Sequence, residues 1–151
     1  MGKPEKFPEE FKQYLNRLIA FVRDETFHGE YNYAISWVYG EVGSDQDCSM
    51  LITVNGTYLY FHLDIGKLLL ESWNKKEYAE IGRAVCHELC HLYTMPMQIP
   101  LLNMAESVNG PEWPKICREV CERQTQRISV FVFRYLKKVH GEFYLPSADL
   151  R

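Results

Sequence analysis

The sequence predicts an α+β fold in which a small three-stranded sheet packs against helices. A block between residues 31 and 64 is rich in β-branched and aromatic residues, as strands are. Segments on both sides of this block carry apolar residues at helical spacing. With 151 residues, of which 46% are hydrophobic and 25% charged, the chain suits a single globular domain, residues 1–151.

A helix is expected near the start of the chain. Pro8 suits a first helical turn, and the two glutamates that follow it favour the positive end of the helix dipole. Apolar residues at positions 11, 15, 18 and 22 then follow helical spacing. The helix is therefore expected to end at about Thr26.

The strand block predicts three strands, at Tyr31–Tyr39, Ser49–Val54 and Thr57–Asp64. Asn55-Gly56 lies between the second and the third, and both residues tolerate positive φ, so the pair indicates a hairpin. The segment Gly43–Asp47 reads as a polar loop between the first two strands.

Three helices are expected after the strands. The segment "IGKLLLESW" predicts a short one. The second runs from about Lys75 to Thr94, because Asn74 and Glu77 have the spacing of a capping box and Pro96 cannot continue a helix. An apolar connection, Met95–Met104, follows as an irregular segment that can wall a pocket or pack as a loop. The last, long helix begins between residues 111 and 115 and ends at about residue 138.

The second of these helices carries the motif H-E-x-x-H, in "AVCHELCHLYT". Residues four apart on a helix differ by roughly 40° in direction, so His87 and His91 can point at one ion. Glu88 lies on the flank of the same face. A zinc ion with three protein ligands lowers the pKa of its bound water to about 7, and Glu88 would act as the general base. The competing interpretation is a helix whose histidines are ordinary surface or core residues.

A zinc site needs a third protein ligand. Met97 stands where one class of zinc peptidases has a third histidine, so a glutamate from a later helix is expected instead. Glu119 and Glu122 lie one turn apart on the last helix. We favour Glu119, because a buried stripe is expected beside it, and keep Glu122 as the alternative. Either residue can also be a solvated helix glutamate paired with a neighbour.

The five cysteines are too few for a disulfide scaffold, which favours reduced thiols in a cytoplasmic protein. Cys86 and Cys90 point roughly 100° away from the histidines and cannot easily share their ion. Cys117 and Cys121 have the same spacing on the last helix. The two pairs can in principle hold a separate ion, but buried packing between helices is favoured.

The chain resembles a minimal zincin-type metallopeptidase of the gluzincin kind, and in particular the small zincin-like proteins of phages and bacteria. The resemblance rests on the "CHELCHLYT" helix, the short strand block before it and the late "REVCERQTQRI" helix. It implies that His87, His91 and Glu119 bind Zn²⁺ and that Glu88 is the catalytic base. It also implies that an extended peptide lies along the third strand, around Tyr58–Asp64, as the edge of the sheet.

The group that would stabilise an oxyanion is not identified by any motif. By chemistry alone the candidates are four residues: Tyr93, Arg123, His140 and Tyr144.

The composition of the chain limits the kinds of partner that we expect it to bind. A net charge of −3 gives no electrostatic case for nucleic acid or for an anionic membrane. The chain opens without an apolar secretory segment, and no apolar run approaches the length that spans a bilayer. The expected function is therefore that of a cytoplasmic zinc peptidase acting on a peptide or protein. The alternative is a metal-binding protein without peptidase activity, acting as a binding or regulatory module.

Overall fold

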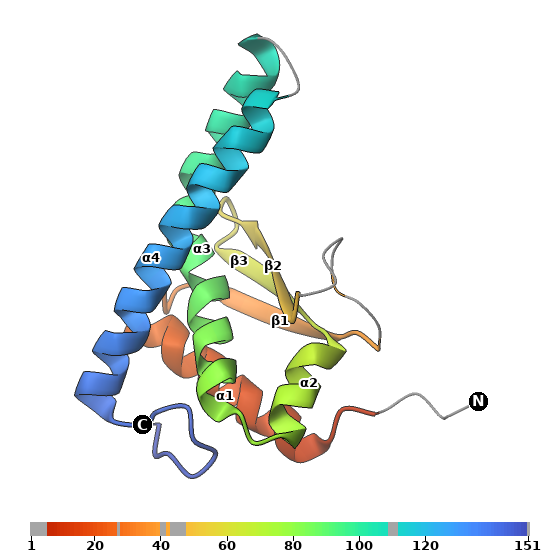
Figure 1. Cartoon of the computed structure of the whole chain (residues 1–151), viewed down its shortest axis with the longest axis vertical. Helices are drawn as coiled ribbons and strands as arrows, with labels where there is room; N and C mark the ends of the chain where they lie inside the picture. The colour runs from red at the N-terminus through yellow and green to blue at the C-terminus, as the bar shows by residue number, and fades with distance from the viewer. Residues whose placement is uncertain (1–5, 27, 40–41, 43–47, 109–111, 151) are drawn as a thin grey trace.

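A computed structural model describes residues 6–26, 28–39, 42, 48–108 and 112–150. It confirms the α+β class (Figure 1). In these residues the elements follow in the order α1 (Glu9–Glu25), β1 (Asn32–Trp37), β2 (Met50–Asn55), β3 (Tyr60–Ile65), α2 (Lys67–Asn74), α3 (Tyr78–Val108) and α4 (Glu112–His140).

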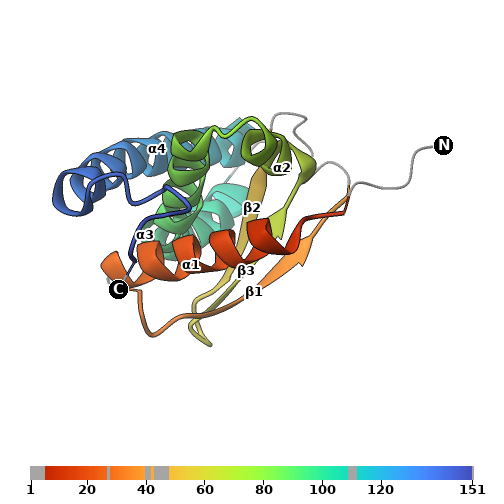
Figure 2. The ribbon, with the colours of Figure 1, turned by 90° about the horizontal axis from the view of Figure 1, so that it is seen from below.

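The sheet is mixed, with the strand order β1-β3-β2. The central strand β3 is parallel to β1 and antiparallel to β2. Alternate residues of β3 are fully buried, namely Phe61, Leu63 and Ile65, and the residues between them are partly or fully exposed. The buried face is the one that meets the helices, which lie to one side of the sheet in Figure 2.

Two details of the predicted sheet are wrong. The third strand is not an edge: β3 is central, and β1 and β2 are the edges. It also begins at Tyr60 rather than Thr57, because the hairpin uses a four-residue connection, 56–59, in which Leu59 has a φ of 48°. The hairpin itself is confirmed. The predicted polar loop Gly43–Asp47 lies outside the described residues.

The first helix is confirmed at Glu9–Glu25, with the two glutamates in its first turn. The apolar residues at positions 11, 15, 18 and 22 are fully buried, so this stripe faces the core as its spacing predicts. Phe11 packs against both Trp37 of β1 and Trp73 of α2. Helix α1 thus joins the sheet to the helical layer.

The short helix before the motif is confirmed as α2, but the predicted capping box is wrong. Asn74 is the last residue of α2, and α3 begins four residues later, at Tyr78. The backbone carbonyl of Glu77 accepts the N–H of Ile81 and so opens α3. The two helices are separated by a tight turn in which Lys76 has a φ of 59°.

The predicted stop at Pro96 is also wrong. Helix α3 continues through Pro96 and Pro100 to Val108, so the segment Met95–Met104 is helical rather than irregular. A proline inside a helix removes one hydrogen bond and costs about 3 kcal/mol. Packing of α3 along α4 offsets this cost; next to Pro96, the buried hydroxyls of Thr94 and Thr125 are hydrogen-bonded at 2.8 Å.

Helix α4 begins at Glu112, within the predicted range, and ends at His140. It runs antiparallel to α3, and the distal halves of the pair project beyond the sheet as a two-helix arm (Figure 1). Below the arm, Phe143 and Tyr144 of the C-terminal segment are buried, and the carbonyl of Tyr144 accepts the hydroxyl of Tyr14 at 2.6 Å. Among the described residues, no helix is both long and apolar enough to cross a membrane.

Candidate metal centre

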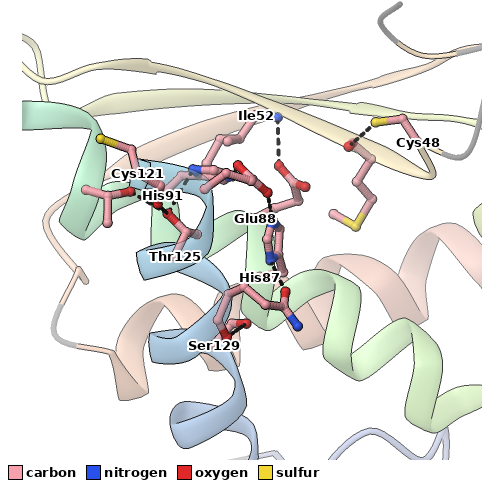
Figure 3. Close-up of polar contacts among 12 residues, drawn as sticks. Cys48, Ile52, His87, Glu88, His91, Cys121, Thr125 and Ser129 are labelled. Carbon is pink, nitrogen blue, oxygen red and sulfur yellow. Dashed lines mark hydrogen bonds and ion pairs between the residues drawn. The ribbon is translucent and has the colours of Figure 1, made fainter. Parts of the chain in front are cut away.

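Helix α3 brings the three motif residues together, as predicted. His87, Glu88 and His91 each offer a ligand atom, and these atoms lie within 4.8 Å of one another. The two imidazole rings are 5.1 Å apart, because one helical turn separates them. Figure 3 shows these side chains between α3, β2 and α4. The group is one that can hold a metal ion.

The opposite face of α3 anchors the motif. Cys86 and Cys90 are fully buried, which agrees with the predicted packing role. Burial raises the pKa of Cys90 to about 12 and raises that of Cys86 as well, so both thiols stay protonated. In the described part of the chain, the motif is the one group of His, Cys, Asp and Glu that fits a metal ion, so a cysteine site is not supported.

A glutamate from α4 meets both histidines. Oε1 of Glu122 lies 2.7 Å from Nε2 of His87, and its Oε2 lies 3.5 Å from Nε2 of His91. Glu119, the favoured candidate from sequence, lines the same cavity as Glu88 and His91. Within the described residues, however, neither histidine hydrogen-bonds Glu119. The structure therefore places the alternative, Glu122, against the motif.

The other nitrogen of each imidazole faces a residue of α4. Nδ1 of His87 donates to Oε1 of Gln126 at 2.8 Å, and Nδ1 of His91 lies 3.5 Å from the hydroxyl of Thr125. The Thr125 hydroxyl itself donates to the carbonyl of Cys121. Partners of this kind fix the orientation of metal-binding histidines and leave Nε2 for the ion.

Gln126 and Thr125 were not predicted from the sequence. The signal for Gln126 was present, since it lies four residues after Glu122 and hence on the same face of α4. Thr125 carries no such signal, because its role depends on how α3 and α4 are aligned.

Glu88 does not share the contacts of Glu122. Its Oε2 accepts the backbone N–H of Ile52 at 3.2 Å. Ile52 belongs to β2, and this N–H is on the side of the strand that has no neighbouring strand. Strand β2 is therefore the sheet edge beside the site.

Burial dominates the electrostatics of Glu88. Burial raises the pKa of this carboxyl, and the charge of His87 lowers it by a smaller amount. The charge of Glu122 raises it further, and the resulting pKa is about 7. A carboxyl with a pKa near neutrality can both accept and release a proton at physiological pH, which is what a general base and acid requires.

His87 and Glu122 favour each other's charged forms. Burial alone would lower the pKa of His87, but the hydrogen bond to Glu122 and the charges of Glu88 and Glu122 outweigh it, and the net shift is upward. The hydrogen bond from His87 lowers the pKa of Glu122. Burial lowers the pKa of His91, which keeps that imidazole neutral and available as a ligand.

The raised pKa of Glu88 predicts how the metal-free protein responds to pH. Folding favours the protonated carboxyl, so its contribution to stability is complete below pH 4.5 and is lost as the pH rises through about 7. Glu88→Gln remains neutral and should become more stable than the wild type across this window, by up to about 3 kcal/mol.

Urea unfolding in the presence of a chelator, between pH 4.5 and pH 8, measures this difference. Glu106→Gln, an exposed change on the same helix, serves as the control. A stability difference between Glu88→Gln and wild type that does not change with pH would contradict the assignment.

An open cavity of about 870 Å³ lies over the motif. Glu88, His91 and Glu122 line it, together with Arg118 and Arg123 of α4. This cavity joins the motif to two cations and to the edge strand, because Met50, Leu51 and Ile52 of β2 form part of its wall.

The four candidates for stabilising an oxyanion differ in whether they can reach the motif. Arg123 lines this cavity. The hydroxyl of Tyr93 is hydrogen-bonded to the carbonyl of Thr26, and His140 pairs with Glu25 at 3.1 Å. Tyr144 is buried and stacked on Phe133. Arg123 is thus the candidate with access to the motif.

No protein-family model, curated protein or solved structure matches the chain. The assignment of the site accordingly rests on its own geometry: an H-E-x-x-H group on a long helix, with a glutamate of a second helix against both imidazoles.

Proposed function

We propose that the protein is a zinc-dependent peptidase in which His87, His91 and Glu122 bind the metal and Glu88 is the general base. One observation carries the proposal. The Nε2 atoms of His87 and His91 both face a single carboxylate, that of Glu122 on α4. The Nδ1 atoms of the two histidines face other residues of α4.

The donor atoms fit a zinc ion. Two imidazoles and one carboxylate are a common catalytic zinc set, with metal–ligand distances of about 2.1 Å. Tetrahedral geometry at that distance separates two ligand atoms by about 3.4 Å. The distance from Nε2 of His91 to Oε2 of Glu122 is already 3.5 Å, whereas the distance from Nε2 of His87 to Oε1 of Glu122 is only 2.7 Å. A small movement of the half-exposed Glu122 would admit the ion in place of the proton between them.

We choose Glu122 over Glu119 as the third metal ligand because of its contacts with the histidines. Glu122 touches both imidazoles. Glu119 lines the same cavity, but within the described residues it forms no hydrogen bond with either histidine. Glu88 offers a third carboxylate close to the histidines, but it is engaged with the edge strand through Ile52. We therefore assign Glu122 to the metal and Glu88 to proton transfer.

A bound zinc ion supplies Lewis acidity, which makes a water molecule nucleophilic near neutral pH. The residues of the chain do the remaining work. Glu88 accepts a proton at its carboxylate and delivers it to the leaving amine. Arg123 places a positive charge in the cavity, where an amide oxygen becomes negative. An extended peptide can pair with the free edge of β2, and in doing so would compete with Glu88 for the Ile52 N–H.

Metal removal tests this function. The protein as purified is expected to contain one zinc per chain and to cleave at least one member of a varied peptide panel. Dialysis against a chelator should abolish cleavage, and one equivalent of zinc should restore it. Stoichiometric zinc without cleavage of any peptide, in a folded sample, would contradict the peptidase and favour the metal-binding module instead.

A further inference from the structure

A second cavity, of about 920 Å³, opens on the other side of His87. Helices α2, α3 and α4 form its walls, and His87 and Gln126 lie where it meets the metal centre. It does not include Glu88, His91 or Glu122, so it is not the cavity in which the proposed chemistry takes place. Its lining indicates what kind of ligand it accepts.

Positive charge dominates this second cavity. Four cations line it: Lys75, Arg83, Arg134 and Lys137. Two carboxylates, Glu71 and Glu80, are also present, so the local balance is four minus two, or +2. The whole chain carries −3, and the cationic lining therefore runs against the overall charge. A cleft lined by one sign of charge concentrates ligands of the opposite sign.

Most of this charge is available to a ligand. Arg83 pairs with Glu80 and lies over the ring of Phe133 at 4.9 Å, which fixes its position. In the described part of the chain, Lys75, Arg134 and Lys137 form no ion pair with a carboxylate. Lys75 follows directly after α2, and Arg134 and Lys137 lie one turn apart on α4, so two separate elements supply the positive charge of the cavity.

The two cavities are lined by neighbouring residues of the motif. His87 lines one and His91, a single turn later, lines the other. The chain before and at the start of β2 borders both, through Ser49 in the basic cavity and through Cys48 and Met50 in the other. A peptide that crosses the histidines would thus extend into the basic cavity on one side.

We propose that the basic cavity binds an acidic segment of the peptide substrate, on one side of the scissile bond, through Lys75, Arg134 and Lys137. The reference to a scissile bond rests on the proposed peptidase function, whereas the binding of acidic side chains does not. A nucleic acid fits less well, because a local balance of +2 on a chain of −3 neutralises few phosphates.

Peptide binding tests the proposal without requiring cleavage. Two fluorescent peptides of equal length are compared on the Glu88→Gln protein, one with a run of Asp and Glu and the other with the same run as Asn and Gln. The acidic peptide is expected to bind about three- to tenfold more tightly at low salt, as exposed charge pairs allow. Added salt should remove the preference, because it screens such pairs.

A pair of double variants locates the binding. Arg134→Gln with Lys137→Gln should abolish the preference for the acidic peptide. Arg127→Gln with Lys138→Gln removes the same charge from exposed positions of the same helix that do not line the cavity, and should retain it. Equal binding of both peptides, equal losses in the two double variants, or tighter binding of a single-stranded oligonucleotide would overturn the proposal.

The two proposals fail separately in this design. If the acidic peptide binds at the cavity but zinc-loaded wild type cleaves no peptide, the peptidase function is wrong and the acidic-ligand site stands. If peptides are cleaved with no preference for acidic residues, the acidic-ligand site is wrong and the peptidase function stands.

Discussion

Glu88→Gln is expected to lower kcat/KM for peptide hydrolysis by about 10²–10⁴-fold while zinc remains bound at one ion per chain. The amide is close in shape to the carboxylate but cannot accept the proton that the nucleophilic water must lose. Its oxygen can still accept the Ile52 N–H, which Glu88 accepts at 3.2 Å, so the contact with β2 should be preserved. The variant therefore separates proton transfer from metal binding and from folding.

Three measurements on one sample check this expectation: the rate of cleavage of the best peptide, the zinc content and the unfolding temperature. Glu106→Gln, an exposed change further along α3, is the control and should match the wild type in all three. Cleavage by Glu88→Gln within a few-fold of the wild-type rate would show that another group is the base. Loss of zinc in Glu88→Gln would instead place Glu88 among the ligands.

The features that could be predicted from the sequence are those set by residues close together in the chain. The H-E-x-x-H spacing fixes the directions of His87 and His91 on a helix whatever surrounds it, and the buried cysteines behind them follow from the same periodicity. The stripe on α1 and the Asn55-Gly56 hairpin are likewise set by neighbours in the chain. Each of these predictions is confirmed.

What the sequence could not predict depends on pairing between distant segments. The central position of β3 is one case, because strand order is not encoded in any single strand. The passage of α3 through Pro96 is another, since a local rule that forbids it is overridden by packing on α4. The choice between Glu119 and Glu122 is of the same kind: the two lie three residues apart, and the alignment of α3 with α4 decides which one meets the histidines.

Glu122→Gln is expected to weaken zinc binding by more than about a hundredfold, and Glu119→Gln to leave it within a few-fold of the wild type. Loss of an outer partner of a metal ligand already costs 10–100-fold in affinity, so loss of the ligand's charge should cost at least as much. The two glutamates lie on the same helix, are exposed to solvent and line the same cavity, which makes each a matched control for the other.

Competition with a chromogenic zinc chelator measures both affinities, and circular dichroism of the metal-free variants confirms that each is folded. Little stability should be lost in Glu122→Gln, because its ion pair with His87 is half exposed and such pairs contribute about 1 kcal/mol or less. If Glu119→Gln loses zinc and Glu122→Gln keeps it, the preference drawn from the sequence is right and the contact of Glu122 with His87 belongs to the metal-free state alone. If neither variant loses zinc, the carboxylate of Glu88 is the remaining candidate for the third ligand, and a single glutamate cannot then serve as both ligand and base.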